Sequence, residues 1–338
     1  RAEALCIADF GNNSLAPQNN RPSYGLCLDG ILGAGLMTMP DSFITRDRFH
    51  DLSLSVHHGP GKPMPGPTVL KAPGLKEPLW TGSQLVGLTL PDDMHWETGK
   101  RPESTLPQFD DWTLIRRGEL MAGWMNKAAV GARSRSMVHY IAIEYGSSAA
   151  MRWLSDVQRV IVKWMVMEGV SMGSDCMIAC DEVAAAVRSA QQKIDPIIES
   201  ALGGIRRARV AGEISTMVAD GLENRLTGLL MQRLSMLARI VLNWIESKKG
   251  YVSKNMLWAM VNTGSKGSPI NVAQMLGGVG QTSLGGGRIV PDAYGMTLPM
   301  YARWDPSLRA RGMIYGSYGR GLTLSEFFMH AVGGREGL

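Results

Sequence analysis

The sequence predicts an α+β protein, because three stretches of the chain differ in composition and in hydrophobic pattern. The first stretch is residues 1–149, of which residues 1 to about 130 are rich in proline and glycine and carry only short apolar runs, which favours strands and loops. Residues 150–250 carry apolar side chains at helical spacing, which favours long helices. From residue 251 to residue 338 glycine is frequent again, which predicts short helices and loops. We treat these stretches as three structural parts.

The first part contains one clear β-hairpin signal. Two short apolar runs, Thr113–Ile115 and Leu120–Trp124, flank the polar segment Arg116–Glu119, as expected for two strands and their turn. The apolar runs Tyr24–Leu28 and Leu85–Leu90 favour further strands. This part is therefore predicted to be mostly strand and loop.

Three helices are predicted in the second part. The first ends at Gly169 and has an apolar face made of Leu154, Val157, Ile161, Trp164 and Met165. The second has Asp181 as its N-cap and carries Val183, Val187, Ala190, Ile194, Ile197 and Ile198. The third ends at Lys248-Lys249-Gly250 and carries Leu222, Leu226, Leu229, Leu230, Leu237, Val241 and Trp244.

The second and third helices are expected to form an antiparallel pair joined by residues Gly203–Gly212. Arg206, Arg207 and Arg209 fall in this predicted connection. A basic run at such a place contacts nucleic acid or an acidic protein in some proteins, although a solvated tip is the commoner meaning.

The composition is that of a globular protein. Apolar residues make up 45% and charged residues 19%, and no apolar run approaches the ~18 residues of a membrane span, so we expect no membrane partner. The net charge of +5 permits a nucleic-acid partner without demanding one, since the basic residues are dispersed. The chain starts at Arg1 without a methionine or a signal-type apolar region, and we expect a processed, split or partial chain.

No metal site is predicted. His57-His58 could ligate a metal, but the neighbouring glycine and proline favour an exposed loop. No histidine stands at zinc-finger spacing, and the cysteines form no CxxC pair, so we expect free thiols in a reducing compartment. The four cysteines are Cys6, Cys27, Cys176 and Cys180.

The most informative motif is a short loop that carries one lysine between two glycines. Gly264 and Gly267, with Ser265 and Ser268, flank Lys266, so the backbone can approach a ligand closely while one ammonium is presented to it. Such a loop suits a polyanion. It is not a Walker A loop, because the Gly-Lys-Ser/Thr order and the four-residue spacer are missing. A solvated turn with an incidental lysine is the alternative.

A short amphipathic helix is predicted at Glu326–Val332. Phe327, Phe328 and Ala331 are expected to pack, and His330 is expected to be a buried packing residue and not a catalyst. The glycine-containing segment Gly333–Leu338 follows this helix.

These motifs together resemble one family. Gly264–Met275, Val279–Gln281 and Glu326–Leu338 resemble the largest subunit of the multisubunit DNA-dependent RNA polymerases, from the phosphate-facing lysine to the residues that open the bridge helix. The versions are nearer to the eukaryotic, archaeal and large-virus branch than to the bacterial one. Weaker matches at the correct spacing are Arg1–Leu5, Ala16–Pro22, Gly25–Asp29, Pro78–Leu85 and Gly169–Asp175.

The resemblance implies an architecture and a site. It implies a pore region over residues 1–149, funnel helices over 150–250, and over 251–338 the phosphate-facing loop and the segment that leads into the bridge helix. These parts would line the secondary channel, through which NTPs enter and RNA backs out during transcription. Lys266 would contact the NTP phosphates. The loop and the bridge helix would be supported by Gly264, Ser265, Gly267, Ser268, Asn271, Gln274, Gln281, Arg335 and Glu336.

The resemblance also implies a toxin pocket beneath the bridge helix. Thr282 stands where the sensitive nuclear enzyme has a second glutamine, and the loss of one amide hydrogen bond, commonly ~1 kcal/mol net, predicts reduced sensitivity. The positions that match those contacting amanitin in the family are Ile270, Ala273, Gln274, Gln281, Ser283 and Glu336.

Activity is implied only for a complex. The family's Asn-Ala-Asp-Phe-Asp-Gly-Asp loop lies before the point where this sequence starts, and Ala8–Gly11 imitates it with a single carboxylate. The resemblance therefore implies a DNA-directed RNA polymerase, a nucleotidyltransferase, whose Mg²⁺ is bound by aspartates outside this chain. We expect no catalytic residue in the chain itself.

The implied partners are the second-largest subunit, the remaining parts of the largest subunit and the other subunits, together with the DNA template, the RNA transcript, NTPs and a transcript-cleavage factor. The implied location is the nucleus, with a viral factory or virion as the alternative. A free-standing nucleic-acid-binding protein would need a dense basic face or stacking aromatics, which aromatic residues at 7% and mixed charges disfavour. A self-sufficient phosphate-handling enzyme would need clustered carboxylates, and none stand at suitable spacing.

Overall fold

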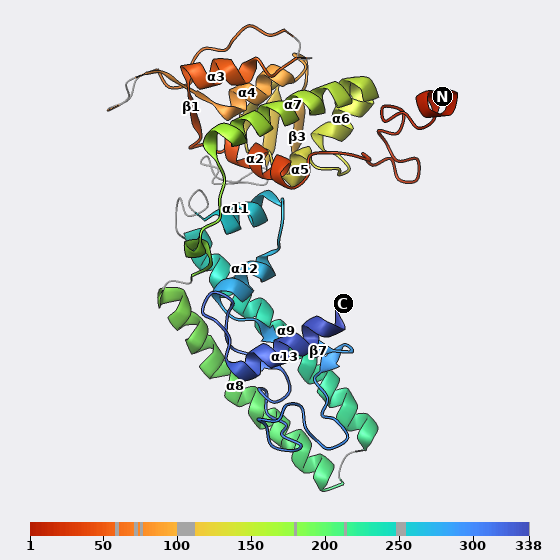
Figure 1. Ribbon diagram of the computed structural model, residues 1–338, viewed down its shortest axis with the longest axis vertical. Coiled ribbons are helices and arrows are strands. Elements are labelled where there is room, and N and C mark those ends of the chain that lie inside the picture. The colour runs from red at the N-terminus through yellow and green to blue at the C-terminus, as the bar shows by residue number, and fades with distance from the viewer. Residues whose placement is uncertain are drawn as a thin grey trace. The chain divides into compact units, whose positions relative to one another are not determined.

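The protein folds into two compact units. The computed structural model describes residues 1–57, 61–70, 74, 77–99, 112–178, 181–212, 215–247 and 255–337. One unit comprises residues 1–171 and 259–266, and the other comprises residues 172–258 and 267–338 (Figure 1). The division into three parts by composition stays a prediction. The predictions made for His58, Cys180, Lys248–Gly250 and Leu338, and for the side chains of Arg206 and Arg209, lie outside the described residues.

The first unit is organised around helix α7, Ser147–Glu168. This helix packs against α2 (Asp29–Met37), α3 (Arg46–Ser53), α4 (Gly82–Thr89) and α6 (Met137–Glu144). The apolar face predicted from the sequence is confirmed, and its buried residues include Trp153, Val157, Val160, Ile161 and Trp164. Gly169 caps the helix at φ 75°, a backbone angle that a residue with a β-carbon rarely adopts, as predicted.

Small antiparallel sheets complete the first unit. Strand β1 (Phe43–Thr45) pairs with β2 (Leu79–Thr81), and β3 (Trp96–Thr98) pairs with β4 (Thr113–Arg116), which pairs with β5 (Glu119–Ala122). The predicted hairpin is therefore confirmed.

The turn of this hairpin is a two-residue loop with a left-handed backbone. Arg117 and Gly118 both have positive φ, 50° and 65°, between the paired residues Arg116 and Glu119. Positive φ at both positions gives the turn a twist that matches the right-handed twist of the strands it joins. The described residues of both units contain helices and small antiparallel sheets, so the α+β class is confirmed.

Most described residues of the first part are strand or loop, as predicted, but two apolar runs were assigned wrongly to strands. The apolar run Leu85–Leu90 lies almost wholly in helix α4, whose start is fixed by a capping box between Thr81 and Gln84. The run Tyr24–Leu28 forms no strand. The short helices α1 (Ala2–Cys6) and α5 (Lys127–Val130) also lie in this part. A run of five or six apolar residues does not distinguish a buried strand from a buried helical turn, and here the capping residues decide.

Helix α4 approaches α2 closely because it starts with a glycine. A β-carbon at Gly82 would overlap the carbonyl oxygen of Met37. Met37 itself is 1% exposed, so its backbone has no room to move away. The contact between the two helices therefore requires a residue without a side chain.

We predict that Gly82→Ala destabilises the first unit by about 1–3 kcal/mol, because the overlap is with backbone and not with a flexible side chain. The matched control is Gly66→Ala, since nothing lies within 4 Å of a β-carbon at Gly66. Limited proteolysis with mass spectrometry should show new cuts within residues 29–90 in the Gly82 variant alone. Equal protease resistance of both variants would contradict the close approach.

The second unit is built on two long antiparallel helices, α8 (Asp181–Val210) and α9 (Thr216–Ser247), which pack along each other (Figure 1). The predicted pair is confirmed. The predicted connection at Gly203–Gly212 is wrong, because α8 continues to Val210 and α9 starts at Thr216. The basic run Arg206–Arg209 therefore lies at the end of α8 and not in the connection.

The glycines of α8 mislead because they face open space. Gly203 and Gly204 have no atom within 4 Å of a built β-carbon, so they mark no turn and no close contact. A glycine in a helix costs about 1 kcal/mol relative to alanine, which a helix supported by packing tolerates. Asp181, predicted as the N-cap, is the first residue of the helix, where its negative charge suits the positive end of the helix dipole.

Short elements pack on this helix pair. Helix α12 (Pro269–Leu276) contacts α9, and so do strands β6 (Gly280–Gln281) and β8 (Gly287–Arg288). Strand β6 pairs with β9 (Met313–Ile314), and β7 (Ser283–Leu284) pairs with β8. Helix α13 (Leu324–Glu336) contacts β7 and β9. The 3₁₀ helix η1 (Ser174–Met177) contacts α12. The sequence boundary between the two units falls within helix α11 (Met256–Thr263), between Trp258 and Ala259.

Helix α13 buries a different face from the one predicted. Phe327 and Phe328 are 55% and 45% exposed, and Ala331 is exposed. The buried residues are Glu326 and Met329. His330 is only half-buried, and its Nε2 lies 2.8 Å from the hydroxyl of Tyr318. The reason is that Glu326 accepts hydrogen bonds from the chain before the helix. The face of α13 that carries Glu326 is therefore buried, and the face that carries Phe327 and Phe328 is exposed.

No helix in the described ranges has the length and hydropathy needed to cross a membrane.

Candidate functional site

The glycine–lysine loop starts where helix α11 ends. Ser265 is buried, and its Oγ donates to the carbonyl oxygen of Met260 at 3.3 Å. Gly264 has φ 77°, and a β-carbon there would stand 2.9 Å from the Cβ of Lys127. These contacts fix the first half of the loop on the first unit, and both glycine positions of the motif, Gly264 and Gly267 at φ 83°, need their glycine.

Lys266 is exposed, as is its neighbour Gly267. The backbone N–H of Lys266 donates to the carbonyl oxygen of Met260 at 3.4 Å, while its side chain points into solvent with no partner among the residues that the structure describes. A lysine without an ion pair on an anchored backbone is available for an external anion. The loop then passes to the second unit between Lys266 and Gly267.

Helix α12 begins directly after the loop with a capping box. The backbone N–H of Ser268 donates to Asn271 Oδ1 at 2.8 Å, and the Ser268 hydroxyl donates to the same oxygen at 2.6 Å. Pro269 occupies the first turn, where its missing N–H costs nothing. Asn271 thus has a local role that fixes where α12 starts. Its predicted support of the bridge helix stays a prediction.

The two predicted glutamines lie on separate elements of the second unit. Gln274, on α12, donates from Nε2 to the carbonyl oxygen of Val279 at 3.4 Å. Gln281 is 7% exposed, and its Nε2 donates at 2.7 Å to the carbonyl oxygens of both Thr282 and Arg311. Each glutamine therefore cross-links nearby backbone, and Gln281 does so from a buried position.

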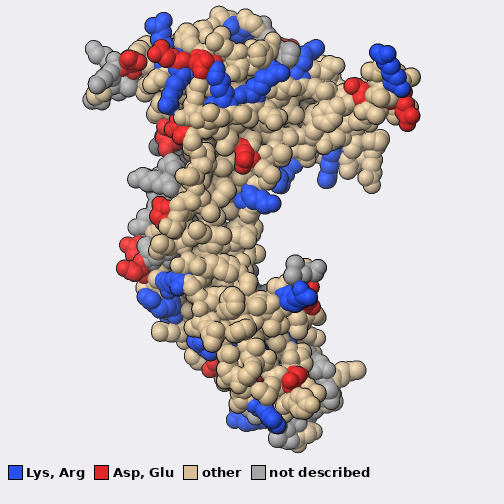
Figure 2. Space-filling model, in the orientation of Figure 1, with Lys and Arg blue, Asp and Glu red and all other residues tan. Residues whose placement is uncertain are grey.

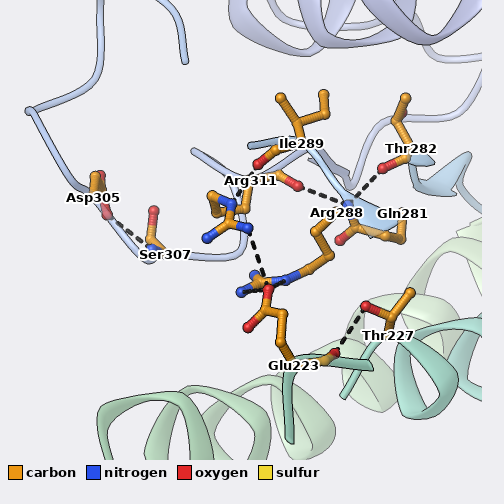
Figure 3. A network of polar contacts seen from close by, with 9 residues as sticks. All are labelled: Glu223, Thr227, Gln281, Thr282, Arg288, Ile289, Asp305, Ser307 and Arg311. Carbon is orange, nitrogen blue, oxygen red and sulfur yellow. Dashed lines mark hydrogen bonds and ion pairs between the residues drawn. The ribbon is translucent and has the colours of Figure 1, made fainter. Parts of the chain in front are cut away.

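A buried ionic cluster lies behind Gln281, and sequence reasoning missed it. Figure 3 shows the Glu223 carboxylate from α9 facing the guanidinium groups of Arg288 and Arg311. The Arg288 side chain is 1% exposed and that of Arg311 is 17% exposed. Burial lowers the pKa of Arg311, the nearby Arg288 lowers it further, and Glu223 opposes both. The only feature of the sequence that indicates this cluster is Arg288, which directly follows three glycines.

The predicted residues at the end of the chain meet the turn between β7 and β8. Glu336 Oε1 accepts a hydrogen bond from the Gly285 backbone N–H at 2.6 Å. A β-carbon at Gly333 would overlap the side chain of Thr282, so α13 rests directly on that residue. Arg335 is exposed. The structure thus brings Gln281, Thr282, Gly333 and Glu336 into one region of the second unit.

The positions predicted to form a toxin pocket fall on four elements. Ile270, Ala273 and Gln274 lie on α12, while Gln281 lies on β6, Ser283 on β7 and Glu336 on α13. Ile270 is 47% exposed, whereas Ala273 is 1% exposed. The buried methyl group of Ala273 faces protein, so a ligand here would meet Ile270 first. The pocket stays a prediction.

Helix α13 is anchored at its start by a buried carboxylate. Glu326 is 4% exposed and accepts hydrogen bonds from the backbone N–H groups of Tyr315, Gly316 and Thr323, at 2.8, 3.2 and 3.0 Å. Burial raises the pKa of Glu326, but these donors and the Thr323 hydroxyl outweigh it, so the net pKa lies below the ordinary 4.5. Glu326 is therefore ionised in the folded protein at neutral pH.

A magnesium site does not fit the described part of this chain. No three His, Cys, Asp or Glu side chains gather there closely enough to hold a metal ion. Asp9, in the segment that imitates an aspartate loop, accepts a hydrogen bond from the Gly11 N–H at 3.0 Å and shapes its own turn. The expectation that Mg²⁺ ligands lie outside the chain stays a prediction.

Comparison with known proteins gives first a class and then a family. Residues 13–175 match RNA polymerase Rpb1, domain 3, and residues 214–314 match RNA polymerase Rpb1, domain 4. The two matches occur in chain order and together cover more than half of the sequence. The class is thus that of the large subunits of multisubunit RNA polymerases. The chain belongs to the RNA polymerase Rpb1 family.

A curated relative agrees with this assignment. The chain is 30% identical, over 346 aligned residues that take in all of it, to the protein named DNA-directed RNA polymerase II subunit RPB1-B of Trypanosoma brucei brucei. The chain spans 18% of the length of that relative. The resemblance predicted from the sequence motifs is confirmed at the level of the family.

We predict that Glu326→Gln loosens the start of α13, because charge-assisted hydrogen bonds, worth about 1.5–3 kcal/mol each, become ordinary ones. Since the folded-state pKa is depressed, this stability is present above pH 4.5 and is lost as the pH falls through the lower folded value. Hydrogen exchange at Tyr315 and Gly316, corrected for intrinsic rates, should be faster in the variant at pH 7 and should converge with the wild type in acid. Glu199→Gln, an exposed carboxylate on α8, is the control. A difference between wild type and Glu326→Gln that does not shrink in acid would contradict the charge argument.

Proposed function

We propose that this chain is the part of the largest subunit of a DNA-directed RNA polymerase that lines the secondary channel, where NTPs enter and the RNA 3′ end backs out. Membership of the Rpb1 family gives the class of the enzyme. The observation that carries the proposal is the exposed ammonium of Lys266, which has no partner in the described part of the chain and stands on a loop whose backbone is anchored by Ser265. Such a group suits the triphosphate of a substrate.

Lys266 would act by electrostatics. During nucleotide addition the negative charge shifts toward the leaving pyrophosphate, and a fixed ammonium nearby stabilises that charge. The anchored loop lowers the reorganisation needed at the moment of reaction, since Ser265 and Gly264 already hold the backbone. Mg²⁺ would supply the two-metal chemistry from residues outside this chain, so no step of the reaction is assigned to a metal ligand here.

The end of the helix pair would serve a protein partner. Arg207, near the end of α8, is exposed, and its Nε donates to the Gly203 carbonyl oxygen at 3.3 Å, while its other donors have no partner among the described residues. We assign this end to the rim of the channel and to a transcript-cleavage factor with an acidic surface. The remaining partners would be the second-largest subunit, the rest of the largest subunit, the DNA template and the transcript, in the nucleus or in a viral factory.

Exposed apolar side chains support the proposal that the chain functions inside an assembly. Leu324, Phe327 and Phe328 on α13 are each 45% exposed or more, and on α7 Val162 and Val166 are 52% and 79% exposed. Large apolar groups of this kind are usually covered by partner subunits. A free-standing nucleic-acid-binding protein is not favoured, because Lys and Arg are interspersed with Asp and Glu on the face that Figure 2 shows.

We predict that Lys266→Ala raises the apparent KM for NTPs in the assembled enzyme and lowers kcat/KM by about one to two orders of magnitude, the worth of one charge-assisted phosphate contact. Lys266→Arg should retain much of the activity, because the charge survives. Single-nucleotide addition on a preformed scaffold measures both. Arg46→Ala, an exposed cation on α3, controls for a general loss of charge. Unchanged kinetics in Lys266→Ala would make the loop structural.

We predict that Arg207→Glu weakens factor-stimulated cleavage of backtracked complexes more than it slows forward elongation, because the end of α8 would lie on the rim of the channel. The control is Arg188→Glu, an exposed arginine on the same helix, 19 residues earlier in sequence and so about 28 Å away along the axis. Both rates are measured on the same scaffolds. Equal losses of cleavage and elongation in Arg207→Glu would contradict this placement.

A further inference from the structure

One carboxylate in the second unit is shared by two arginines. Glu223 Oε1 accepts from Arg288 Nε at 2.7 Å and lies 2.7 Å from Arg288 Nη2 and 3.3 Å from Arg311 Nη2 (Figure 3). The Arg288 side chain is 1% exposed, so its charge is almost wholly removed from water. Glu223, whose side chain is 28% exposed, is the counter-ion of both cations.

The cluster contains no second acid among the described side chains shown in Figure 3. Asp305 lies in the loop that precedes Arg311, but its carboxylate accepts a hydrogen bond from the Ser307 backbone N–H at 2.8 Å and not from either arginine. Arg288 Nη1 is buried and has no hydrogen-bond partner in the described part of the chain. Loss of the Glu223 charge would therefore leave two guanidinium groups facing each other with nothing to neutralise them, a costly arrangement for buried charge.

The two arginines connect Glu223 to the loops of the unit. Arg288 ends strand β8, which pairs with β7 through Ser283. Arg311 donates from Nε to the Ile289 carbonyl oxygen, and its own carbonyl oxygen accepts from Gln281 at 2.7 Å. The Glu223 carboxylate thus holds the β7–β8 hairpin and the chain around Arg311 against helix α9.

The same hairpin holds the second half of α13. Gly285, in the turn of the hairpin, donates to Glu336 at 2.6 Å. Thr282, just before the hairpin, lies under Gly333 so closely that a β-carbon on the glycine would overlap it. Strands β7 and β8 have only two residues each, so their own ladder contributes little rigidity. The position of the second half of α13 therefore depends on the contact of the hairpin with α9.

We propose that Glu223 is a positioning residue that, through Arg288 and Arg311, sets where the second half of α13 lies relative to α9. The inference rests on the proposed function in one respect, namely that α13 leads toward the catalytic centre of a polymerase. Glu223 touches no substrate. Loss of Glu223 would slow nucleotide addition because α13, which leads toward the catalytic centre, would be displaced.

The kinetic test uses the assembled polymerase carrying Glu223→Gln. We expect kcat at saturating NTP to fall about two- to thirtyfold, the range of couplings carried through a packed network, while the KM for NTP stays within about twofold. This pattern is the opposite of the KM effect expected for Lys266→Ala. Arg225→Gln is the matched control, because Arg225 is exposed on the same helix and also loses one charge.

A double variant separates positioning from simple charge neutralisation. Glu223→Gln with Arg288→Met removes the orphaned buried cation together with its carboxylate, and such a replacement is often neutral for stability. We expect the double variant to assemble like the wild type and to keep the low kcat of Glu223→Gln, because the link to α9 is still absent. Recovery of kcat in the double variant would overturn the proposal.

Hydrogen exchange reads the position of α13 without any assay of activity. In Glu223→Gln and in the double variant, peptides that cover residues 324–336 should exchange faster, while peptides within residues 181–200 of α8 stay unchanged. Unchanged exchange of α13 would overturn the proposal even if kcat fell. Faster exchange of α13 supports the link even if Lys266→Ala has no effect, so failure of the proposed function and failure of this inference give different results.

Discussion

The second unit depends on a single carboxylate, that of Glu223, which is the counter-ion of the buried Arg288. Between Gly277 and Thr323 the chain forms only two-residue strands, so backbone pairing alone cannot hold this long segment in place. Glu223 holds it through Arg288 and Arg311, which lie 65 and 88 residues further along the sequence. Because Arg288 is buried, its charge is tolerated only with this partner. The loop that follows α12 is therefore tied to α9 through one residue of that helix.

Short helices in the protein start where their capping residues place them. Helices α4, α12 and α13 each begin with a capping box, between Thr81 and Gln84, between Ser268 and Asn271, and between Thr323 and Glu326. A capping box satisfies backbone N–H groups that the helix leaves without partners, so it fixes the first residue independently of packing. In α13 the same glutamate also reaches back to Tyr315 and Gly316. The Glu326 side chain thus binds both the chain that follows β9 and the first turn of α13.

Patterns within one element were predictable from the sequence, and contacts between distant elements were not. The face of α7, its end at Gly169 and the hairpin at Arg117-Gly118 follow from periodicity and turn residues. The two helices of the antiparallel pair follow from periodicity alone, since the glycines placed their connection wrongly. The Leu85–Leu90 run was misassigned because a short apolar run suits both strand and helix. Phe327 and Phe328 were expected to be buried because their side chains are apolar. They are exposed because Glu326 is buried in their place, and the hydrogen-bond partners of Glu326 lie before the helix, where the pattern of the helix does not reveal them. The Glu223 cluster left almost no trace in the sequence.

We propose that the loop carrying Lys266 faces the triphosphate of an incoming nucleotide in an assembled polymerase. An electron cryo-microscopy map of the polymerase that contains this chain, with a non-hydrolysable NTP bound, tests this placement. We expect Lys266 Nζ to lie within ~4 Å of a phosphate oxygen, the range of an ion pair. A map in which the ammonium lies farther from every phosphate than the ~8 Å over which salt screens exposed charges would contradict it.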